Sequence, residues 1–188
     1  MKQITPELPP LSPSQQEIVR LVGARAENIY DARGYCCAEA VLCVLNQGFG
    51  GDLAPEMAVR LGSGFCHGMG SAGCTCGSLA GAEIGLSLLL GPRQPGGMKK
   101  KEFEALAKAM HDRFRERFSA TCCRVLLKRR KEKKGASCKE LTGGGAELAA
   151  TLLLAARPEL ERKADLEFLR SRESKVAGMA KRLLGKQL

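Results

Sequence analysis

Large aromatic side chains are scarce in this chain of 188 residues, which has no tryptophan and is only 4% aromatic. A β-sandwich draws on β-branched and aromatic residues for its core, so this scarcity argues against a sheet protein. The sequence also shows no alternating strand pattern and no internal repeat. We therefore expect an all-α protein, a compact bundle of about six to eight helices with a glycine- and cysteine-rich loop.

Long apolar runs of the kind that cross a membrane are also missing. The longest stretch without Asp, Glu, Lys or Arg, residues 61–82, contains seven glycines and is a poor spanning segment. The first twelve residues are polar and proline-rich, and they lack the basic and apolar regions of a signal peptide. We expect a cytoplasmic protein with no membrane partner.

Acidic residues are outnumbered, with 20 against 30 basic residues and a net charge of +10. This balance favours solubility, and it would also suit an acidic partner. The basic segment 128–134 has no interleaved aromatic residues on which bases could stack, so nucleic acid is not the expected partner. We interpret the segment as a solvated connector or as a docking patch for an acidic redox protein. A homodimer remains open.

Capping signals divide the chain into helices. Ser12, followed by Pro13 and by Gln15 in a capping-box position, starts a first helix that ends near Gly34. Four further helices are expected at 36–48, 55–61, 76–90 and 98–118. A short helix should follow Ser119 or Thr121, and another should start at Ser137 with an interruption at glycines 143–145. A last helix is expected from Pro158 to a point before Gly185. These limits predict a flexible segment 1–11, a redox domain 12–156 and a charged C-terminal helix 157–188.

Cysteine, in contrast, is abundant, with nine residues. An odd number excludes complete disulfide pairing within the chain. In a chain without a secretion signal, this many cysteines indicate metal, cluster or redox chemistry. A helix start stabilises a thiolate through its free N–H groups and its dipole, which predicts depressed thiol pKa values. Four cysteines lie near predicted helix starts: Cys37, Cys76, Cys123 and Cys138. If these starts converge, they form a pocket for an iron–sulfur cluster or a reactive thiol pair.

The separations of the four cysteines, 39, 47 and 15 residues, match neither a zinc ribbon nor the common ferredoxins. The ordered pattern nevertheless resembles a known family over roughly residues 18–156, the redox-active proteins named after the motif C_GCAxxG_C_C. The resemblance is carried by Cys37-Ala-Glu-Ala-Val-Leu42, the glycine-rich segment 62–70, Thr75-Cys-Gly-Ser-Leu-Ala-Gly81, Thr121-Cys-Cys-Arg124 and Cys138. Ser78 stands where the motif has alanine.

The resemblance implies that Cys37, Cys76, Cys123 and Cys138 bind an iron–sulfur cluster in an electron-transfer protein. The pattern is also similar to the non-haem domain of split-Soret cytochrome c, which implies [2Fe–2S] over [4Fe–4S]. A second thiol stands beside three of the four positions, as Cys36, Cys74 and Cys122, so either member of each close pair could be the ligand.

Two other functions stay open at this point. One is a thiol–disulfide oxidoreductase in which a low-pKa Cys76 attacks a substrate and Cys74 resolves the intermediate. The other is a basic interaction protein with a structural zinc, because four cysteines are a standard zinc set. A c-type haem is not expected, since Cys66-His67 has Ser63 where the attachment motif needs cysteine.

Overall fold

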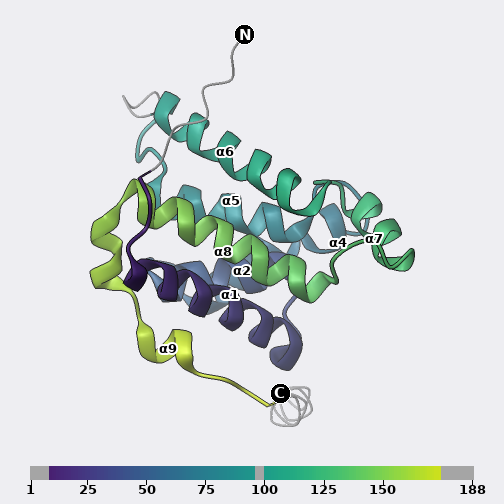
Figure 1. The fold of residues 1–188 in the computed structure, drawn as a ribbon, viewed down its shortest axis with the longest axis horizontal. Coiled ribbons are helices and arrows are strands. Elements are labelled where there is room, and N and C mark those ends of the chain that lie inside the picture. The colour runs from purple at the N-terminus through teal and green to yellow at the C-terminus, as the bar shows by residue number, and fades with distance from the viewer. Residues whose placement is uncertain (1–8, 96–99, 175–188) are drawn as a thin grey trace.

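The computed structural model describes residues 9–95 and 100–174, and this part of the chain is helical (Figure 1). Its extended pairing is limited, among the described residues, to one antiparallel bridge between Thr75 and Cys122. The all-α prediction is confirmed, and two very short helices, α4 and α9, bring the described α-helices to nine. The elements are α1 (Pro13–Arg33), α2 (Cys37–Gly48), α3 (Pro55–Ser63), α4 (Cys66–Met69), α5 (Gly77–Leu90), α6 (Lys100–Phe118), α7 (Cys123–Lys131), α8 (Cys138–Ala156), the 3₁₀ helix η1 (Pro158–Lys163) and α9 (Leu166–Arg170).

Helix α8 occupies the centre of the bundle and packs against α1, α2, α5 and α6 (Figure 1). Its start is the capping box expected from the sequence: the Ser137 hydroxyl accepts the Glu140 N–H at 3.2 Å, and the Glu140 carboxylate accepts the Ser137 N–H at 2.7 Å. Leu152, Leu153 and Leu154 are fully buried. A continuous apolar run is typical of a helix that is covered on all sides.

The interruption expected at glycines 143–145 is wrong, because α8 runs unbroken through them. Neighbouring side chains occupy the space that side chains at these positions would need. Glu27 lies against Gly143, Phe118 against Gly144 and the Ser78 hydroxyl against Gly145. The glycines lower the intrinsic helix propensity, but they let three neighbouring helices approach the α8 backbone closely, and packing outweighs propensity here.

Helices α2 and α5 lie close together with their N-terminal ends at the same end of the bundle. A Cβ atom at Gly81 would stand 2.9 Å from the Ala38 Cα, so a larger residue would push the two backbones apart. Further along, Gly85 of α5 lies against Leu45 of α2. This close crossing brings the first residues of the two helices side by side.

The single charged helix expected from Pro158 is also wrong within the described residues. Instead the chain forms η1 and then α9, and residues 171–174 are not helical. Asp165 donates its N–H to the Gly48 carbonyl at 3.0 Å, which returns the chain to α1 and α2 rather than continuing a helix. The expected flexible segment 1–11 and the expected end of the C-terminal helix fall largely on residues 1–8 and 175–188, which lie outside the described part.

A buried arginine holds this C-terminal segment in place. Arg25 of α1 is 1% exposed and donates to the Ser171 carbonyl at 3.1 Å. Its guanidinium also lies 4.8 Å from the centre of the Phe168 ring. Asn28 adds two hydrogen bonds to the backbone of Glu173, at 2.9 and 3.0 Å.

No helix in the described residues is both long and apolar enough to cross a membrane.

Candidate functional site: a cavity lined by four thiols

Four helix starts meet at one cavity. Cys37, Cys123 and Cys138 are the first residues of α2, α7 and α8, and Cys76 is the N-cap of α5. All four line a single cavity of about 50 Å³. Its remaining walls are Tyr30, Cys36, His67, Leu126, Leu127 and Leu141. The placement of these cysteines at helix starts was predicted from the sequence, and the structure brings the four starts together. Their role as ligands stays a prediction.

Two loop segments far apart in the sequence are paired to form one wall. Cys76 donates its N–H to the Thr121 carbonyl at 2.7 Å, and Cys123 donates to the Cys74 carbonyl at 2.6 Å. Arg124 extends the pairing through its N–H to the Gly73 carbonyl at 3.1 Å. Helix α5 therefore starts beside α7. Thr75 and Thr121 belong to this pairing. The N-caps of the two helices are Cys76 and Cys122.

The sulfur of Cys37 occupies the space that a side chain at position 77 would fill. A Cβ at Gly77 would lie 2.5 Å from the Cys37 Sγ and 2.9 Å from the Phe65 carbonyl oxygen. The glycine of the Cys76-Gly77 motif is therefore required by the approach of a second cavity thiol. Backbone N–H groups of His67 and Ala38 donate to the Cys37 sulfur, and those of Ser78 and Leu79 donate to the Cys76 sulfur.

The structure separates the members of each close cysteine pair. Cys74 is exposed, whereas Cys76 is 4% exposed and lines the cavity. The sulfur of Cys122 lies 3.0 Å from the Gly73 carbonyl oxygen and does not line the cavity, whereas Cys123 does.

In the third pair both members line the cavity, but Cys36 is joined to Cys66 in a disulfide and Cys37 is a free thiol. Cys43, which faces the core from α2, is buried as a small apolar residue.

Burial dominates the electrostatics of the thiols. It is the largest cause that raises the pKa of the Cys37 thiol, and the neighbouring Cys138 raises it further. Burial together with the charge of Cys37 raises the pKa of Cys76 to about 12. Burial also raises the pKa of Cys123, and Cys138 adds to it.

The depressed pKa values expected at helix starts are therefore wrong for Cys37, Cys76 and Cys123. The backbone N–H groups do favour the thiolates of Cys37 and Cys76, but burial and like charges outweigh them. A thiol with a pKa near 12 is almost fully protonated at neutral pH and is a poor nucleophile. This argues against Cys76 as the attacking residue of a dithiol enzyme.

The short helix α4 and the residues just after it, which contribute His67 to the cavity wall, have an unusual backbone. Residues 67–71 all have positive φ angles, including the non-glycine residues His67 (55°), Met69 (63°) and Ser71 (73°). Non-glycine residues in this region are strained, and such residues gather at functional sites. The exposed His67 nevertheless keeps its backbone N–H on the Cys37 sulfur. The conformation therefore serves to place a hydrogen-bond donor at the cavity.

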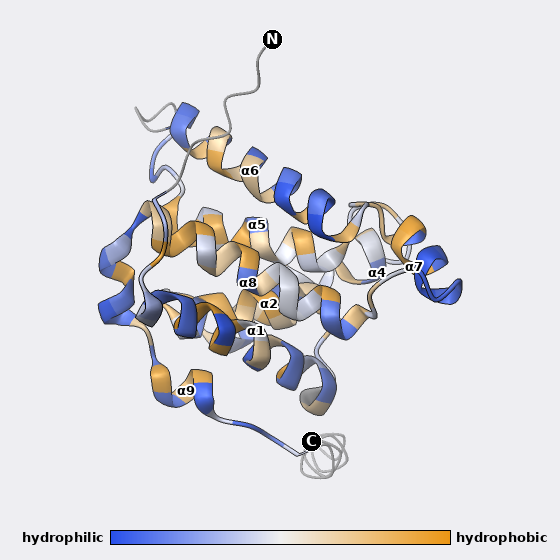
Figure 2. Ribbon diagram, viewed as in Figure 1, coloured by the Kyte–Doolittle hydropathy of each residue, from blue (hydrophilic) through white to orange (hydrophobic). Residues whose placement is uncertain are grey.

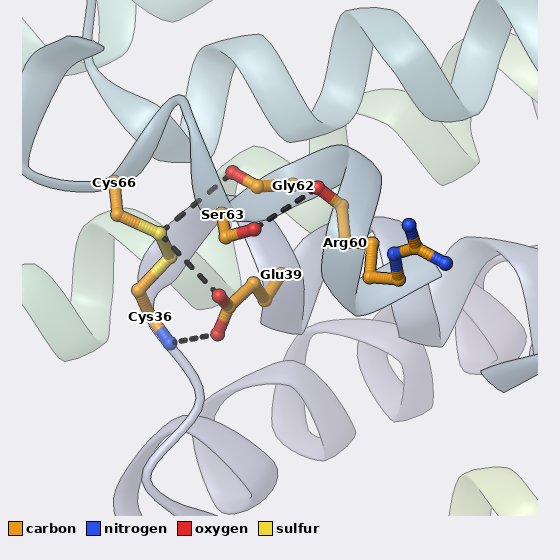
Figure 3. Close-up of a disulfide and its surroundings, with 6 residues drawn as sticks. All are labelled: Cys36, Glu39, Arg60, Gly62, Ser63 and Cys66. Atoms are coloured by element: carbon orange, nitrogen blue, oxygen red, sulfur yellow. Dashed lines mark hydrogen bonds between the residues drawn. A yellow bond between two sulfur atoms is a disulfide. The ribbon is translucent and has the colours of Figure 1, made fainter. Parts of the chain in front are cut away.

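No pattern in the sequence predicted the disulfide between Cys36 and Cys66 (Figure 3). It joins the N-cap of α2 to the first residue of α4, with 5.8 Å between the two Cα atoms. Glu39 lies beside it and accepts the Cys36 N–H at 2.9 Å. Cys36 and Glu39 stand in the spacing of a capping box, which marks the start of α2 and carries no information about a disulfide.

These features define a class: a cysteine-rich helical protein whose redox-capable thiols converge from four helix starts. A family model described as "Putative redox-active protein (C_GCAxxG_C_C)" matches residues 35–152. The match contains all four cavity cysteines and covers more than half of the chain, so the chain belongs to this redox-active family. No curated protein and no solved structure matches it.

Proposed function

We propose that the protein transfers electrons through an iron–sulfur cluster held by Cys37, Cys76, Cys123 and Cys138. The observation that carries this proposal is the convergence of the four thiols on one cavity. Such a cluster, when bound, would supply a one-electron redox couple. The chain contributes the four sulfurs, excludes water with the leucines of the cavity wall, and directs backbone N–H groups at Cys37 and Cys76.

The raised pKa values fit a metal-binding set. Protons on buried thiols are displaced when a cation binds, because the cation neutralises the charge that burial and the neighbouring thiolates disfavour. Without a cation, several ionised sulfurs in one small apolar cavity repel one another. The donor set therefore suits a positively charged inorganic group better than a set of free thiolates.

The size of the cavity supports a small cluster. About 50 Å³ holds roughly three to five atoms the size of a water molecule. A [2Fe–2S] cluster has four inorganic atoms and a [4Fe–4S] cluster has eight. The volume thus favours [2Fe–2S] over [4Fe–4S].

The spread of the sulfurs argues against the zinc alternative. Tetrahedral Zn–S bonds of about 2.3 Å place all four sulfurs roughly 3.8 Å apart. Among the described residues, the group of ligand atoms that all lie within 4.8 Å of one another is Cys36, Glu39 and Cys66, and the four cavity thiols form no such group. Ligands shared between two irons are spread more widely than ligands of a single ion.

A basic surface beside the cavity supports an acidic redox partner. The last turn of α7 carries Lys128, Arg129, Arg130 and Lys131, and this end of the helix is strongly hydrophilic (Figure 2). The same helix starts at Cys123 and contributes Leu126 and Leu127 to the cavity. Arg130 also places a guanidinium nitrogen 3.7 Å from the Cys138 sulfur. A partner that docks on these charges would lie within one short helix of the cavity.

The test is anaerobic purification followed by iron, zinc and acid-labile sulfide analysis and a visible spectrum of the same sample. We expect about two irons and two sulfides per chain, as a [2Fe–2S] cluster requires, and their loss in Cys76→Ser. The matched control is Cys43→Ser, because Cys43 is buried in α2 away from the cavity. Stoichiometric zinc, or a colourless protein that reconstitution does not change, would overturn the proposal.

A further inference from the structure

The Cys36–Cys66 disulfide lies at the cavity but is not needed to hold a cluster there. Cys36 lines the cavity, and Cys66 precedes His67, whose backbone N–H donates to Cys37. Seven other cysteines of the chain are free, including the four cavity thiols. An accessible disulfide can exchange with thiols, and Cys36 is partly exposed.

From this arrangement we propose that Cys36–Cys66 is a thiol–disulfide exchange site for small dithiols, with Cys36 as the sulfur that is attacked and Cys66 as the sulfur that is released. The proposal does not depend on the cavity holding a cluster, and it places the exchange chemistry at a pair other than Cys74 and Cys76.

Exposure sets the direction of the reaction. Cys36 is partly exposed, whereas Cys66 is only 9% exposed. An incoming thiolate therefore reaches the Cys36 sulfur more easily than the Cys66 sulfur, and accessibility is one of the factors that decide which sulfur is attacked.

Hydrogen-bond acceptors are already in place for the Cys66 thiol that reduction produces. The Cys66 sulfur lies 3.7 Å from a Glu39 carboxylate oxygen and 3.7 Å from the Gly62 carbonyl oxygen (Figure 3). A disulfide sulfur has no hydrogen to donate, but the reduced Cys66 thiol has one. Glu39 meanwhile keeps the Cys36 backbone in position through the N–H bond at 2.9 Å. The reduced state is thus accommodated without a new arrangement of neighbours.

The reaction balances as an exchange of two electrons. One thiolate of the dithiol bonds to Cys36 Sγ, the Cys36–Cys66 bond breaks, and its electron pair stays on Cys66 Sγ, which takes a proton. The second thiolate of the dithiol then attacks its own bound sulfur, forms a cyclic disulfide and releases Cys36 as a thiol. The dithiol is oxidised by two electrons, and the protein disulfide is reduced by two.

The experiment uses the full-length protein, equilibrated anaerobically with mixtures of reduced and oxidised dithiothreitol, then acid-quenched, alkylated and mapped by mass spectrometry. We expect Cys36 and Cys66 to change together from disulfide to alkylated thiols as the reduced fraction rises, and to return when it falls. Two free thiols at the oxidising limit, or a disulfide that opens only in denaturant, would overturn the proposal. Iron and sulfide measured on the same samples report on the cluster separately.

Single variants test which sulfur is attacked. The probe is glutathione disulfide, and the measured quantity is the rate at which the remaining cysteine of the pair becomes glutathionylated. Because access controls thiol reactivity, Cys36 in the Cys66→Ser variant should react at least about tenfold faster than Cys66 in the Cys36→Ser variant. Cys43→Ser, in which both members of the pair remain, is the matched control and should show wild-type exchange. Equal rates at the two sulfurs, or a faster rate at Cys66, would contradict the assignment. The wild-type titration stands on its own if a variant does not fold.

Discussion

A thiol at a helix start is subject to two opposing influences in this protein. Backbone N–H groups favour its ionised form, and burial beside other thiols disfavours it. The sequence revealed the first influence, because capping signals and cysteines coincide. The second depends on helices that are distant in the sequence, so the sign of the pKa shift could not be predicted. The same contacts show which cysteine of each close pair faces the cavity as a free thiol.

Gly77 is expected to be intolerant of even a methyl group. In Gly77→Ala the new Cβ would meet the Cys37 sulfur at 2.5 Å, which forces the sulfur or the helix start to move. We expect a loss of stability of about 1–3 kcal/mol and a loss of bound iron. Chemical denaturation and metal analysis measure the two effects. Gly64→Ala is the control, since nothing lies within 4 Å of its Cβ position; equal behaviour of the two variants would contradict this account of the motif.

Glu83 makes stability depend on pH. Burial raises its pKa from an ordinary value of 4.5 to about 7, so the folded state binds this proton more tightly than the unfolded state does. The contribution of Glu83 to the free energy of unfolding is therefore fully present at low pH, and it is lost as pH rises from about 4.5 to about 7. We expect this to remove about 1–3 kcal/mol of stability, an amount reduced by partial solvent access.

Denaturant midpoints measured from pH 4.5 to 8 check this prediction. Glu83→Gln cannot ionise, and its profile should lack the fall that the wild-type protein shows over this range. If the variant and the wild-type protein give parallel profiles, Glu83 does not ionise as its burial requires.

At the scale of elements, sequence signals located most helix starts and failed where distant contacts decide. The capping box at Ser137 and the first residue of α2 were predicted within a residue. The glycines of α8 were misjudged because their packing partners come from other helices. The C-terminal helix was misjudged because its charged pattern did not reveal that Arg25, 146 residues earlier, holds the backbone at Ser171.

Arg25 is expected to decide whether the α9 segment stays attached to α1. Arg25→Ala removes a buried guanidinium from the Phe168 ring and from the Ser171 carbonyl, leaving that carbonyl and the nearby Glu173 carboxylate without this partner. We expect a loss of about 3–5 kcal/mol, the range for breaking a buried charged network. Denaturation and amide hydrogen exchange at residues 166–171 measure it.

The control for Arg25 is Arg20→Ala, which breaks an exposed ion pair with Glu17 in the same helix. Exposed pairs contribute little, so its stability and its exchange pattern should stay close to those of the wild-type protein. A similar small effect for Arg25→Ala would show that the C-terminal segment is held by other contacts.

At the scale of the whole molecule, the basic last turn of α7 lies beside the cavity that the four thiols line. Helix α7 contributes Cys123, Leu126 and Leu127 to the cavity and ends in the basic turn, whereas the start of α6 lies far from α7 (Figure 1). Composition gave the net positive charge, and motifs gave the four cysteines. Their proximity follows from the antiparallel bridge between residues 75 and 122 and from the glycine contacts of α5, which no local pattern in the sequence reveals.

Docking through the basic end of α7 predicts a charge-dependent rate of electron transfer. Lys128→Glu/Lys131→Glu should slow the reaction with a small acidic one-electron carrier by about tenfold or more at low salt, because electrostatic steering sets such rates. Stopped-flow absorbance measures the rate against ionic strength. Lys101→Glu, an exposed charge reversal near the start of α6, should leave the rate almost unchanged. Equal slowing by both substitutions would point to net charge and not to this surface.

The most direct test of the central claim compares two adjacent cysteines. Cys123 lines the cavity and Cys122 does not, so iron and acid-labile sulfide per chain are measured anaerobically in Cys123→Ser, Cys122→Ser and the wild-type protein. We predict that Cys122→Ser keeps the wild-type content of iron and sulfide and that Cys123→Ser loses it. Loss in Cys122→Ser with retention in Cys123→Ser, or no iron and sulfide in any of the three after reconstitution, would contradict a cluster held by the four cavity thiols.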